Sequence, residues 1–536
     1  MGAIAVSDLS YAHPGGDVLF TGVSFRLTSG RHAGLVGANG VGKSTLMRIA
    51  AGLLEPLEGA VAIDGHMLYM AQDVGTGEGS VRELLLASAP ARVAAAGSAM
   101  LTAERELAQG DESAGLRLGE AIGTWSDLGG YELEGAWDAA CRRIVGGGLA
   151  EVGDRPAVTL SGGERKQLVL EVLFASDAEV LLLDEPDNFL DVPAKLALEE
   201  RIRTTKKTIL LISHDRALLS AACDAIVTLE GDGCWVHGAS YATYREAREH
   251  RQTLMGDRLQ RWKAEELRLR ELVRLFKERA KYSPVWAKKA DAMETRWKRW
   301  VDDGPPPPPV VDHSIKVHLR GGDSARRVIA FHDVAIDGLV KPFEDEIHFG
   351  ERVGLIGPNG TGKTHVMRLL AGEDIPHEGR VVLGPRVSPG LFTQLGTRED
   401  LTGAPLLDLV IERVKSTERA MNALARYGLQ DAARRTPETL SGGQRARLEI
   451  LCLEVEGHNL LLLDEPTDNL DIESSEALEH AMDGFGGTIV AVSHDRAFLQ
   501  RLDRFLLIGA DGAVTAVPDP QRALEALGER PQLKRD

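Results

Sequence analysis

Cysteine is scarce in this chain. Four of the 536 residues are cysteines, and no two of them form a C-x-x-C pair: Cys141, Cys223, Cys234 and Cys452. Zinc knuckles and iron–sulfur clusters need closely spaced thiolates, and disulfide frameworks are typical of small secreted domains. The sequence therefore predicts neither a cysteine-based metal centre nor disulfides, and we expect the four thiols to be reduced and structural.

Long apolar runs are missing as well. No stretch approaches the roughly 18 consecutive apolar residues that a membrane-spanning helix needs. The first ten residues, MGAIAVSDLS, lack the charged and apolar pattern of a secretory signal. We expect a cytoplasmic protein without membrane contact. Hydrophobic residues make up 43% of the chain, which is ample for real cores, and 536 residues leave room for about three domains.

What the chain does contain is one set of motifs, present twice. The first copy consists of GANGVGKST from Gly37, LSGGERKQL from Leu160, LLLDEP from Leu181 and SHDR from Ser213. The second consists of GPNGTGKTH from Gly357, LSGGQRARL from Leu440, LLLDEP from Leu461 and SHDR from Ser493. The last three motifs recur at a constant offset of 280 residues. A register held over three motifs indicates a duplicated ATPase unit.

The first motif of each set is the phosphate-binding pattern G-x-x-x-x-G-K-[ST]. Its glycines let backbone N–H groups close on phosphate oxygens at a helix N-terminus, and its lysine reaches the β and γ phosphates. The nucleotide-binding residues predicted from this motif are Gly37, Asn39, Gly40, Gly42, Lys43, Ser44 and Thr45 in the first copy, and Gly357, Asn359, Gly360, Gly362, Lys363, Thr364 and His365 in the second.

Each set also offers oxygen ligands for Mg²⁺. The hydroxyls of Ser44 and Thr364 are predicted to bind this hard ion, helped by Asp184 and Asp464. Both aspartates end a run of three leucines that is typical of a buried parallel strand.

A glutamate and a histidine of each set are predicted to be catalytic. Glu185 and Glu465 follow the aspartates directly, where a carboxylate can polarise the attacking water, so both sites are predicted to hydrolyse ATP. His214 and His494 each follow a predicted strand, TILLI or TIVAV. A lone histidine is more often a satisfied core or surface residue, but this placement favours a contact with the γ-phosphate.

These residues resemble the ATP-binding-cassette superfamily, whose signature is LSGG ahead of the aspartate strand, and the resemblance covers most of the chain. It implies two cassettes, head to tail, that enclose each ATP between one phosphate loop and the other cassette's LSGG helix. ATP would close the two halves and hydrolysis would release them. One site would pair Lys43 with Ser441 and Gly443, and the other would pair Lys363 with Ser161 and Gly163.

The same resemblance assigns further roles. Gln72 and Gln394 match the glutamine that touches Mg²⁺ and the attacking water, and Asp191 and Asp471 match the aspartate of the D-loop. Tyr11 stands where an aromatic ring stacks on adenine. The predicted fold class is α/β, with two P-loop nucleotide-binding domains of the ABC type joined by an α-helical hairpin linker. We place the domains at residues 1–240, 241–316 and 317–536.

The segment between the two sets has its own charge. Residues 241–301 contain 17 Lys and Arg against nine Asp and Glu, although the whole chain has a net charge of −18. Clustered positive charge on an acidic protein indicates where it meets a polyanion.

Apolar residues in this segment follow two helical stripes. Leu269, Val273, Phe276 and Ala280 form one, and Trp286, Ala290, Met293, Trp297 and Trp300 form the other. Because a turn is predicted near residues 282–284, the two helices are expected to pack as an antiparallel hairpin, with Trp297 and Trp300 in its core. Five prolines from Pro305 then predict a stiff spacer.

The turn of the hairpin is basic and aromatic. Five cations surround it beside Tyr282 and Trp286: Lys277, Arg279, Lys281, Lys288 and Lys289. This mixture is typical of a surface that touches RNA, whereas a charge run of this kind is also found on ordinary solvated faces.

Tandem cassettes, no membrane domain and a charged hairpin between them resemble the ABC-F family of ATPases, most of which act on the ribosome. Members bind the E site, and their linker reaches toward the P-site tRNA and the peptidyl-transferase centre. GPNGTGKTH, LLLDEPTDNLD and IKVHLRGG look most like actinobacterial ribosome-protection proteins that confer resistance to macrolide-type antibiotics. The resemblance implies ATP and Mg²⁺ as cofactors, rRNA and tRNA as partners of residues 241–301, and a monomer whose own cassettes dimerise.

Three other functions stay open at this point. A housekeeping translation factor of the same family would share every motif. The ATPase subunit of a transporter with separate membrane subunits would need a membrane partner and would have no use for a basic hairpin. A DNA-associated cassette protein is the third, because basic charge alone does not distinguish RNA from DNA.

The two halves also differ from each other and from the family pattern. The first half has about 42 more residues than the second between its Gln72 and its LSGG signature, within residues 73–159. These residues are predicted to form either an arm toward the ribosomal stalk or a lengthened helical subdomain. Asp187 and Phe189 replace the usual threonine and histidine, a change expected to affect communication through the D-loop. Ile336 aligns with Tyr11, so base stacking is not expected in the second half, and His365 replaces a common threonine.

Overall fold

The computed structural model describes residues 2–16, 18–74, 79–230, 233–282, 284–309, 317, 319, 322–392, 399–468 and 470–528. The chain divides into two compact units. One unit contains both cassettes, in residues 1–240 and 313–536, and the other is the segment from Tyr241 to Asp312. The predicted end of the linker at residue 316 lies outside the described residues.

The first cassette is built on a six-stranded sheet with the order β5-β6-β7-β3-β8-β9. Its strands are β3 (His32–Val36), β5 (Met67–Met70), β6 (Val180–Asp184), β7 (Thr208–Ile212), β8 (Ala225–Glu230) and β9 (Gly233–His237). Only the β8–β9 pairing is antiparallel. The leucine run before Asp184 is therefore a buried parallel strand, as predicted.

A second, antiparallel sheet of this cassette has the order β2-β1-β4. Its strands are β1 (Ala3–Ala12), β2 (Val18–Leu27) and β4 (Glu58–Asp64). Side chains of this sheet share one core with β3 and with the helix after the phosphate loop, α1 (Lys43–Ala50). The phosphate loop is thus held between a buried strand and a helix packed in the same core.

The second cassette repeats this plan. Its six-stranded sheet has the order β14-β15-β16-β12-β17-β18, and its antiparallel sheet has the order β11-β10-β13. The strands are β10 (Arg327–Ile336), β11 (Val340–His348), β12 (Arg352–Ile356), β13 (Glu378–Leu383), β14 (Pro389–Phe392), β15 (Leu460–Asp464), β16 (Thr488–Val492), β17 (Arg504–Ile508) and β18 (Val514–Val517). The two sheet orders correspond strand for strand, which confirms the predicted duplication.

Helices complete each cassette. The first has α2 (Val81–Ala87), α3 (Ala91–Ala108), α4 (Ala114–Asp127), α5 (Gly130–Ile144), α6 (Leu149–Val152), α7 (Gly162–Ala175), α8 (Val192–Thr204) and α9 (Arg216–Ala222). The second has α12 (Lys363–Leu370), α13 (Leu406–Val414), α14 (Thr417–Arg426), α15 (Gly442–Glu456), α16 (Ile472–Asp483), α17 (Arg496–Leu499) and α18 (Pro520–Gly528). In the described residues, no helix combines the length and apolarity needed to span a bilayer.

The additional residues of the first cassette form a helical subdomain. Helices α2 to α5 share a core with α7, in which Trp125 and Trp137 are buried and their ring centroids lie 6.2 Å apart. The additional residues are thus helical. A packed core with two tryptophans fits a lengthened helical subdomain.

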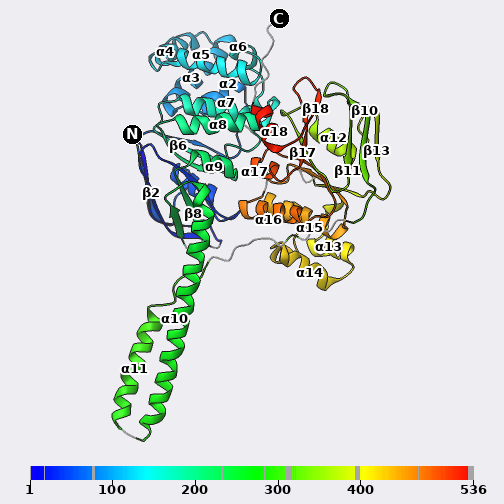
Figure 1. The fold of residues 1–536 in the computed structure, drawn as a ribbon. Helices are drawn as coiled ribbons and strands as arrows, with labels where there is room; N and C mark the ends of the chain where they lie inside the picture. Colours follow the sequence, from blue (N-terminus) through cyan, green and yellow to red (C-terminus); the bar gives the residue numbers. More distant parts are fainter. Residues whose placement is uncertain are drawn as a thin grey trace. The chain divides into compact units, whose positions relative to one another are not determined.

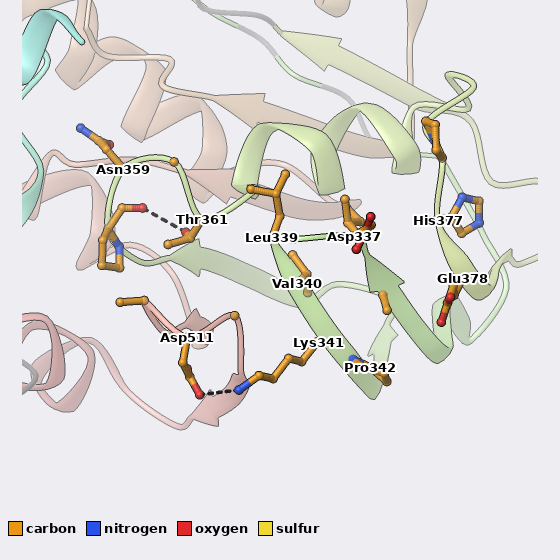
Figure 2. A pocket seen from close by; sticks show the side chains of 18 residues that line it. Asp337, Leu339, Val340, Lys341, Pro342, Asn359, Thr361, His377, Glu378 and Asp511 are labelled. Atoms are coloured by element: carbon orange, nitrogen blue, oxygen red, sulfur yellow. Dashed lines mark hydrogen bonds and ion pairs between the residues drawn. The ribbon is translucent and has the colours of Figure 1, made fainter. Parts of the chain in front are cut away.

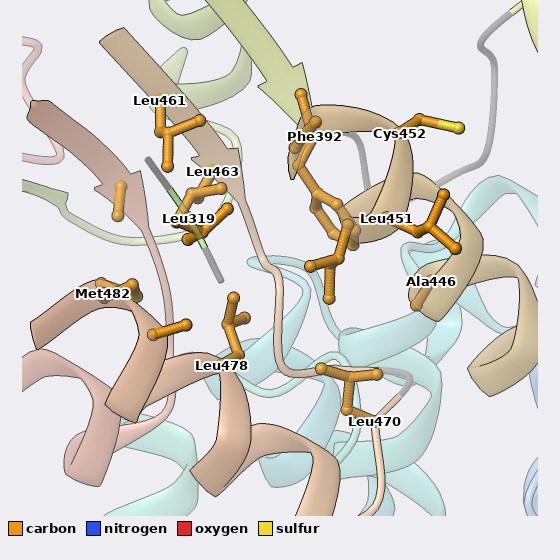
Figure 3. Packing of buried hydrophobic residues seen from close by; sticks show 14 of the residues in the cluster. Leu319, Phe392, Ala446, Leu451, Cys452, Leu461, Leu463, Leu470, Leu478 and Met482 are labelled. Carbon is orange, nitrogen blue, oxygen red and sulfur yellow. The ribbon is translucent and has the colours of Figure 1, made fainter. Parts of the chain in front are cut away.

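The core of the second cassette lies between its sheet and its helices (Figure 3). Leu461 and Leu463 of β15 face Leu451 of α15 and Leu478 of α16, and Leu319 is inserted among them. The same cluster includes Val192, at the start of α8 in the first cassette, and Leu527 of α18. Helices α8 and α18 are in contact, so apolar packing continues from one cassette into the other.

The second unit is a helical hairpin. Helix α10 (Tyr244–Ala280) and helix α11 (Pro284–Asp302) lie side by side, as predicted (Figure 1). The rings of Trp262 and Trp300 are stacked with centroids 6.3 Å apart, and Trp297 Nε1 donates to Glu266 Oε1 at 3.2 Å. Trp297 and Trp300 of the second stripe therefore face α10.

At the turn, Trp286 is partly covered. Its ring packs on Phe276 at 5.5 Å, with Arg279 and Lys289 at 5.0 and 4.6 Å from its centroid. Trp286 is thus engaged within the hairpin, because the stripe on α11 continues to its first turn. Tyr282, which is 90% exposed, is the ring that the tip presents to solvent.

Candidate functional site

The two phosphate loops have the same conformation. Lys43 Nζ donates to the carbonyls of Gly37 and Ala38 at 2.8 and 3.2 Å, and Lys363 Nζ donates to the matching carbonyls at 2.8 Å. Gly42 and Gly362 precede the helices at φ 103° and 93°, a region that L side chains rarely adopt. Both loops thus present helix N-terminal N–H groups and a lysine, the donor set that phosphate oxygens need.

The hydroxyl and the carboxylate predicted for Mg²⁺ lie together in the first cassette. Ser44 Oγ donates to Asp184 Oδ1 at 3.2 Å. Burial raises the pKa of Asp184 and of Asp464 above the usual range, a cost that a bound cation would offset. No cluster of three or more His, Cys, Asp or Glu side chains that could hold a metal exists among the described residues. The residues fit an ion that takes one hydroxyl, one carboxylate and phosphate oxygens.

Glu185 is the centre of a polar cluster in the first cassette. Its carboxylate accepts hydrogen bonds from Gln72 Nε2 at 2.6 Å and from Asn188 Nδ2, and His214 Nε2 lies 3.8 Å from it. Burial, followed by the charges of Asp184 and Asp187, raises the pKa of Glu185 to about 7. A carboxyl group poised near neutral pH suits general-base chemistry.

The matching cluster in the second cassette has different contacts. Glu465 Oε2 accepts the backbone N–H of His494 at 3.0 Å, and His494 Nε2 lies 3.1 Å from Asn359 Oδ1. Burial raises the pKa of Glu465 well above the usual range. Burial also lowers the pKa of His494, and that of His214 to about 3, so both imidazoles are neutral near pH 7.

The two signature serines begin helices. Ser161 and Ser441 are the N-caps of α7 and α15, and each forms a reciprocal capping box with the residue three positions later, Glu164 or Gln444. The free N–H groups and the dipole of a capped helix favour an anion at that end. This is the property that the predicted contact with ATP requires.

Residues of both cassettes line one cavity of about 360 Å³. The second cassette contributes Asn359, Gly360, Gly362, Lys363, Thr364, His365, Asp464, Glu465 and His494, and the first contributes Ser161, Gly163, Phe189 and Lys195. Asn359 Nδ2 donates to the carbonyl of Phe189 at 3.2 Å. The structure therefore brings the predicted partners Lys363, Ser161 and Gly163 to one site.

At the other predicted site, the described contact is between Asn39 and the second D-loop. The backbone N–H of Asn39 donates to Asp471 Oδ2 at 3.3 Å, and Arg447 donates to the same oxygen at 2.9 Å. The pairing of Lys43 with Ser441 and Gly443 stays a prediction. Gln394 lies outside the described residues.

The position of Tyr11 leaves little room for adenine. Its ring is 8% exposed in the core of the antiparallel sheet, 6.3 Å from Phe20. The neighbouring His13 is exposed and meets the Tyr11 ring edge-on at 5.4 Å. A stacking role for Tyr11 remains a prediction.

Beside the second phosphate loop lies a larger pocket of about 750 Å³, shown in Figure 2. Leu339, Pro358 and Ile336 form apolar parts of its lining, and His377 and Glu378 lie at another side. The ion pair of Lys341 and Asp511, at 2.8 Å, closes its edge. The pocket thus adjoins Asn359 and Thr361 of the phosphate loop.

Several residues at the cassette interface were not found from the sequence. Arg216 is paired with Glu479, with Nη1 3.3 Å from Oε2, and the equivalent Arg496 is paired with Glu199 at 2.8 Å. Lys195 Nζ donates to the carbonyl of His494 at 3.2 Å. The two arginines end the SHDR motifs, so a comparison of the halves residue by residue would have found their repetition.

The comparisons with known proteins agree with this architecture. The ABC transporter family model matches residues 20–188 and 340–468. An antibiotic resistance protein of Mycobacteroides abscessus is 40% identical over 97% of this chain and 100% of its own length. ATP-binding cassette sub-family F member 3 of Mus musculus is 28% identical over 95% of this chain and 72% of its own. The chain belongs to the ABC-F family.

Two further proteins, one relative and one solved structure, are similar to this ABC-F protein over most of the chain. The tylosin resistance ATP-binding protein TlrC of Streptomyces fradiae is 30% identical, over 93% of this chain and 96% of TlrC. The archaeal ribosome recycling factor aABCE1, solved with the archaeal ribosomal stalk protein aP1, has a TM-score of 0.63 at 20% identity, covering 98% of this chain and 94% of that one. At this identity the second match supports the fold alone, two nucleotide-binding domains in one chain.

Proposed function

We propose that this ABC-F protein hydrolyses ATP at two sites between its cassettes. The cavity shared by Lys363 and Ser161 carries the proposal, because it joins a phosphate loop to the opposite signature helix. Glu185 and Glu465 are the proposed bases, and His214 and His494 the residues that contact the γ-phosphate. The remaining predicted binding residues of both loops, with Gln72 and Gln394, hold the nucleotide.

Each residue has a defined task in this reaction. Lys43 and Lys363 leave their own loop carbonyls to bind phosphate oxygens, and the helix N-termini at Ser161 and Ser441 close over the nucleotide from the other cassette. Mg²⁺, held by Ser44 with Asp184 and by Thr364 with Asp464, supplies charge neutralisation at the phosphates when bound. A deprotonated Glu185 accepts a proton from the attacking water.

We further propose the ribosome as the partner and macrolide-type antibiotics as the compounds against which it protects. The relatives named for antibiotic and tylosin resistance align over 97% and 93% of the chain. The tip of the hairpin combines an exposed Tyr282 with Arg279 and Lys289, which suits contact with RNA bases and phosphates. Action on the ribosome implies a cytoplasmic location.

The test uses a variant that closes but does not hydrolyse. Glu185→Gln with Glu465→Gln should retain ATP binding, and we expect it to sediment with 70S ribosomes in ATP and not without it. A matched variant adds Lys281→Glu and Lys288→Glu at the hairpin tip, and it should sediment less at the same ATP concentration. In a translation assay the unmodified protein should restore synthesis that a macrolide inhibits.

Each competing function predicts another outcome. Recovery with membranes and not with ribosomes would favour a transporter subunit, and capture by duplex DNA over ribosomes would favour a DNA-associated protein. Sedimentation with ribosomes without any restoration of drug-inhibited synthesis would favour a housekeeping translation factor. Rapid ATP turnover by the double variant would contradict the two proposed bases.

A further inference from the structure

The two halves are not equivalent at the D-loop. Most interface residues recur 280 positions apart, including Arg216 with Arg496 and Glu199 with Glu479. Asp187 and Lys195 of the first half do not. Asp187 corresponds to Thr467, and Lys195 corresponds to Ser475. Both changes lie in the first cassette, and they introduce one negative and one positive charge.

These two residues belong to one buried cluster. Lys195 is 6% exposed, and its Nζ lies 3.5 Å from Asp215 Oδ2. Asp187 is also buried, and Arg496 of the second cassette lies 3.6 Å from Asp215 Oδ1. Burial alone would lower the pKa of Lys195, but Asp215 and Asp187 raise it above its usual value, so this lysine is charged.

The ammonium group of Lys195 also reaches the other cassette. It donates to the backbone carbonyl of His494, and the same histidine donates its N–H to Glu465 and has its ring 3.1 Å from Asn359. Backbone and ring of His494 are therefore fixed by groups from both cassettes. The residue that corresponds to Lys195 in the second half is Ser475, whose short side chain has no charge.

We propose that Lys195 is a positioning residue for the second ATP site: it holds His494 from across the interface and so makes the two sites hydrolyse ATP at different rates. The inference rests on the proposed hydrolysis at both sites. The second site is the one formed by Lys363 and Ser161. Asp187 and Asp215 keep the cation in place, which explains why the aspartate and the lysine occur together in the same half.

The test compares single-site proteins. Glu185→Gln leaves hydrolysis to the second site, and Glu465→Gln leaves it to the first. We expect Lys195→Met to lower kcat about tenfold in the Glu185→Gln protein with KM within about twofold, and to change kcat less than about twofold in the Glu465→Gln protein. Arg203→Met, on an exposed position of the same helix, is the matched control and should change neither.

Two additional measurements separate positioning from folding. Asp187→Thr with Lys195→Ser installs the residues of the second half and removes both charges, so the core keeps its charge balance. At alkaline pH, where Glu185 is deprotonated with or without Asp187, the selective loss at the second site should persist. In the protein labelled with [¹⁵N]histidine, Lys195→Met should shift the imidazole signal of His494, assigned with His494→Asn, and leave that of His214 unchanged.

Failure of the inference is distinct from failure of the proposed function. Absence of ATP turnover in the parent single-site proteins would contradict the proposed hydrolysis, while the His494 signal would still test the contact. Equal losses in both single-site proteins, or an unchanged His494 signal, would overturn the positioning role of Lys195.

Discussion

At the scale of single residues, the backbone conformation of Glu185 determines where its carboxyl group lies. Its backbone has φ 50° at the end of a buried strand, and Glu465 has 48° at the same place, a conformation that costs a non-glycine residue about 1–3 kcal/mol. The strain is repeated at both sites. It turns each carboxyl group off the strand end toward the neighbouring histidine, at 3.8 Å for Glu185 and 3.5 Å for Glu465.

The raised pKa of Glu185 predicts a pH dependence. A general base acts as the carboxylate, so activity that needs it is absent below its pKa and appears as the pH rises through that value. In the Glu465→Gln protein, kcat should therefore increase with pH around a midpoint of about 7. Steady-state hydrolysis measured at saturating ATP across this range provides the check.

A neighbouring residue supplies the control for this profile. Asp187 contributes to the raised pKa through like charge, so Asp187→Thr in the same protein should move the midpoint to lower pH. A rate that is flat from mildly acidic to mildly alkaline pH would argue against Glu185 as the base.

Functional residues can be predicted from the sequence when their role depends on residues close to them in the chain. The phosphate loops, the strand-ending aspartates and the capping serines all depend on neighbours within a few positions, and their motifs carry that information. Lys195 depends on a carbonyl 299 residues away, in the other cassette. Nothing in its own surroundings marks it, and only the mismatch with Ser475 in the second half indicates a special role.

At the scale of elements, the helical subdomain of the first cassette contains glycines with opposite roles. Gly119 lies on the exposed side of α4, and a Cβ there would meet nothing within 4 Å. Gly97 is buried on α3, where a Cβ would overlap Leu86 and come within 3.0 Å of Trp125. Glycine in a helix costs roughly 0.5–1 kcal/mol relative to alanine unless packing requires it.

The two substitutions should therefore change stability in opposite directions. Gly119→Ala is expected to stabilise α4 by about 0.5–1 kcal/mol, and Gly97→Ala to destabilise the subdomain by about 1–3 kcal/mol. Native-state hydrogen exchange of the α3 and α4 amides reports these local values in a chain of several domains. Slower exchange with Gly97→Ala would disprove the packing argument.

Much of the hairpin, but not all of it, was predicted from the spacing of its apolar residues. Apolar spacing along α10 and α11 predicted both helices, their turn and their contact faces. The pattern did not predict that Trp286 packs on Phe276 under two cations, because a stripe position next to a turn can be either covered or open. Coverage depends on the partner helix, whose register is set by all the contacts together.

At the scale of the whole molecule, ion pairs repeated on both sides join the cassettes. Arg216 and Glu479 form one, and Arg496 and Glu199 form the other, all with side chains at most 17% exposed. Removing one partner of an isolated buried pair costs about 3–5 kcal/mol, whereas apolar replacement of both is often nearly neutral. Arg216 also lies 3.6 Å from Glu476 and from Asp495, and Arg496 lies 3.6 Å from Asp215, so the cost here is smaller.

A double-mutant cycle tests this interface. In the Glu185→Gln, Glu465→Gln protein, Arg216→Met and Glu479→Met should each weaken ATP-induced closure, and the two together should weaken it less than the sum of both. Fluorescence transfer between labels on the two cassettes, titrated with ATP, measures closure. Arg496→Met with Glu199→Met is the matched cycle, and strictly additive effects in both would show that the pairs do not couple the cassettes.

The contact between α18 and α8 limits how the molecule can open. Leu527 and Val192 lie in one apolar cluster that belongs to both cassettes, so drawing the cassettes straight apart would expose it to water. Helix α8 also carries Lys195, which donates to the carbonyl of His494 at the second ATP site. We therefore expect the cassettes to separate least along this edge, so that the second ATP site stays more closed than the first when the cassettes open.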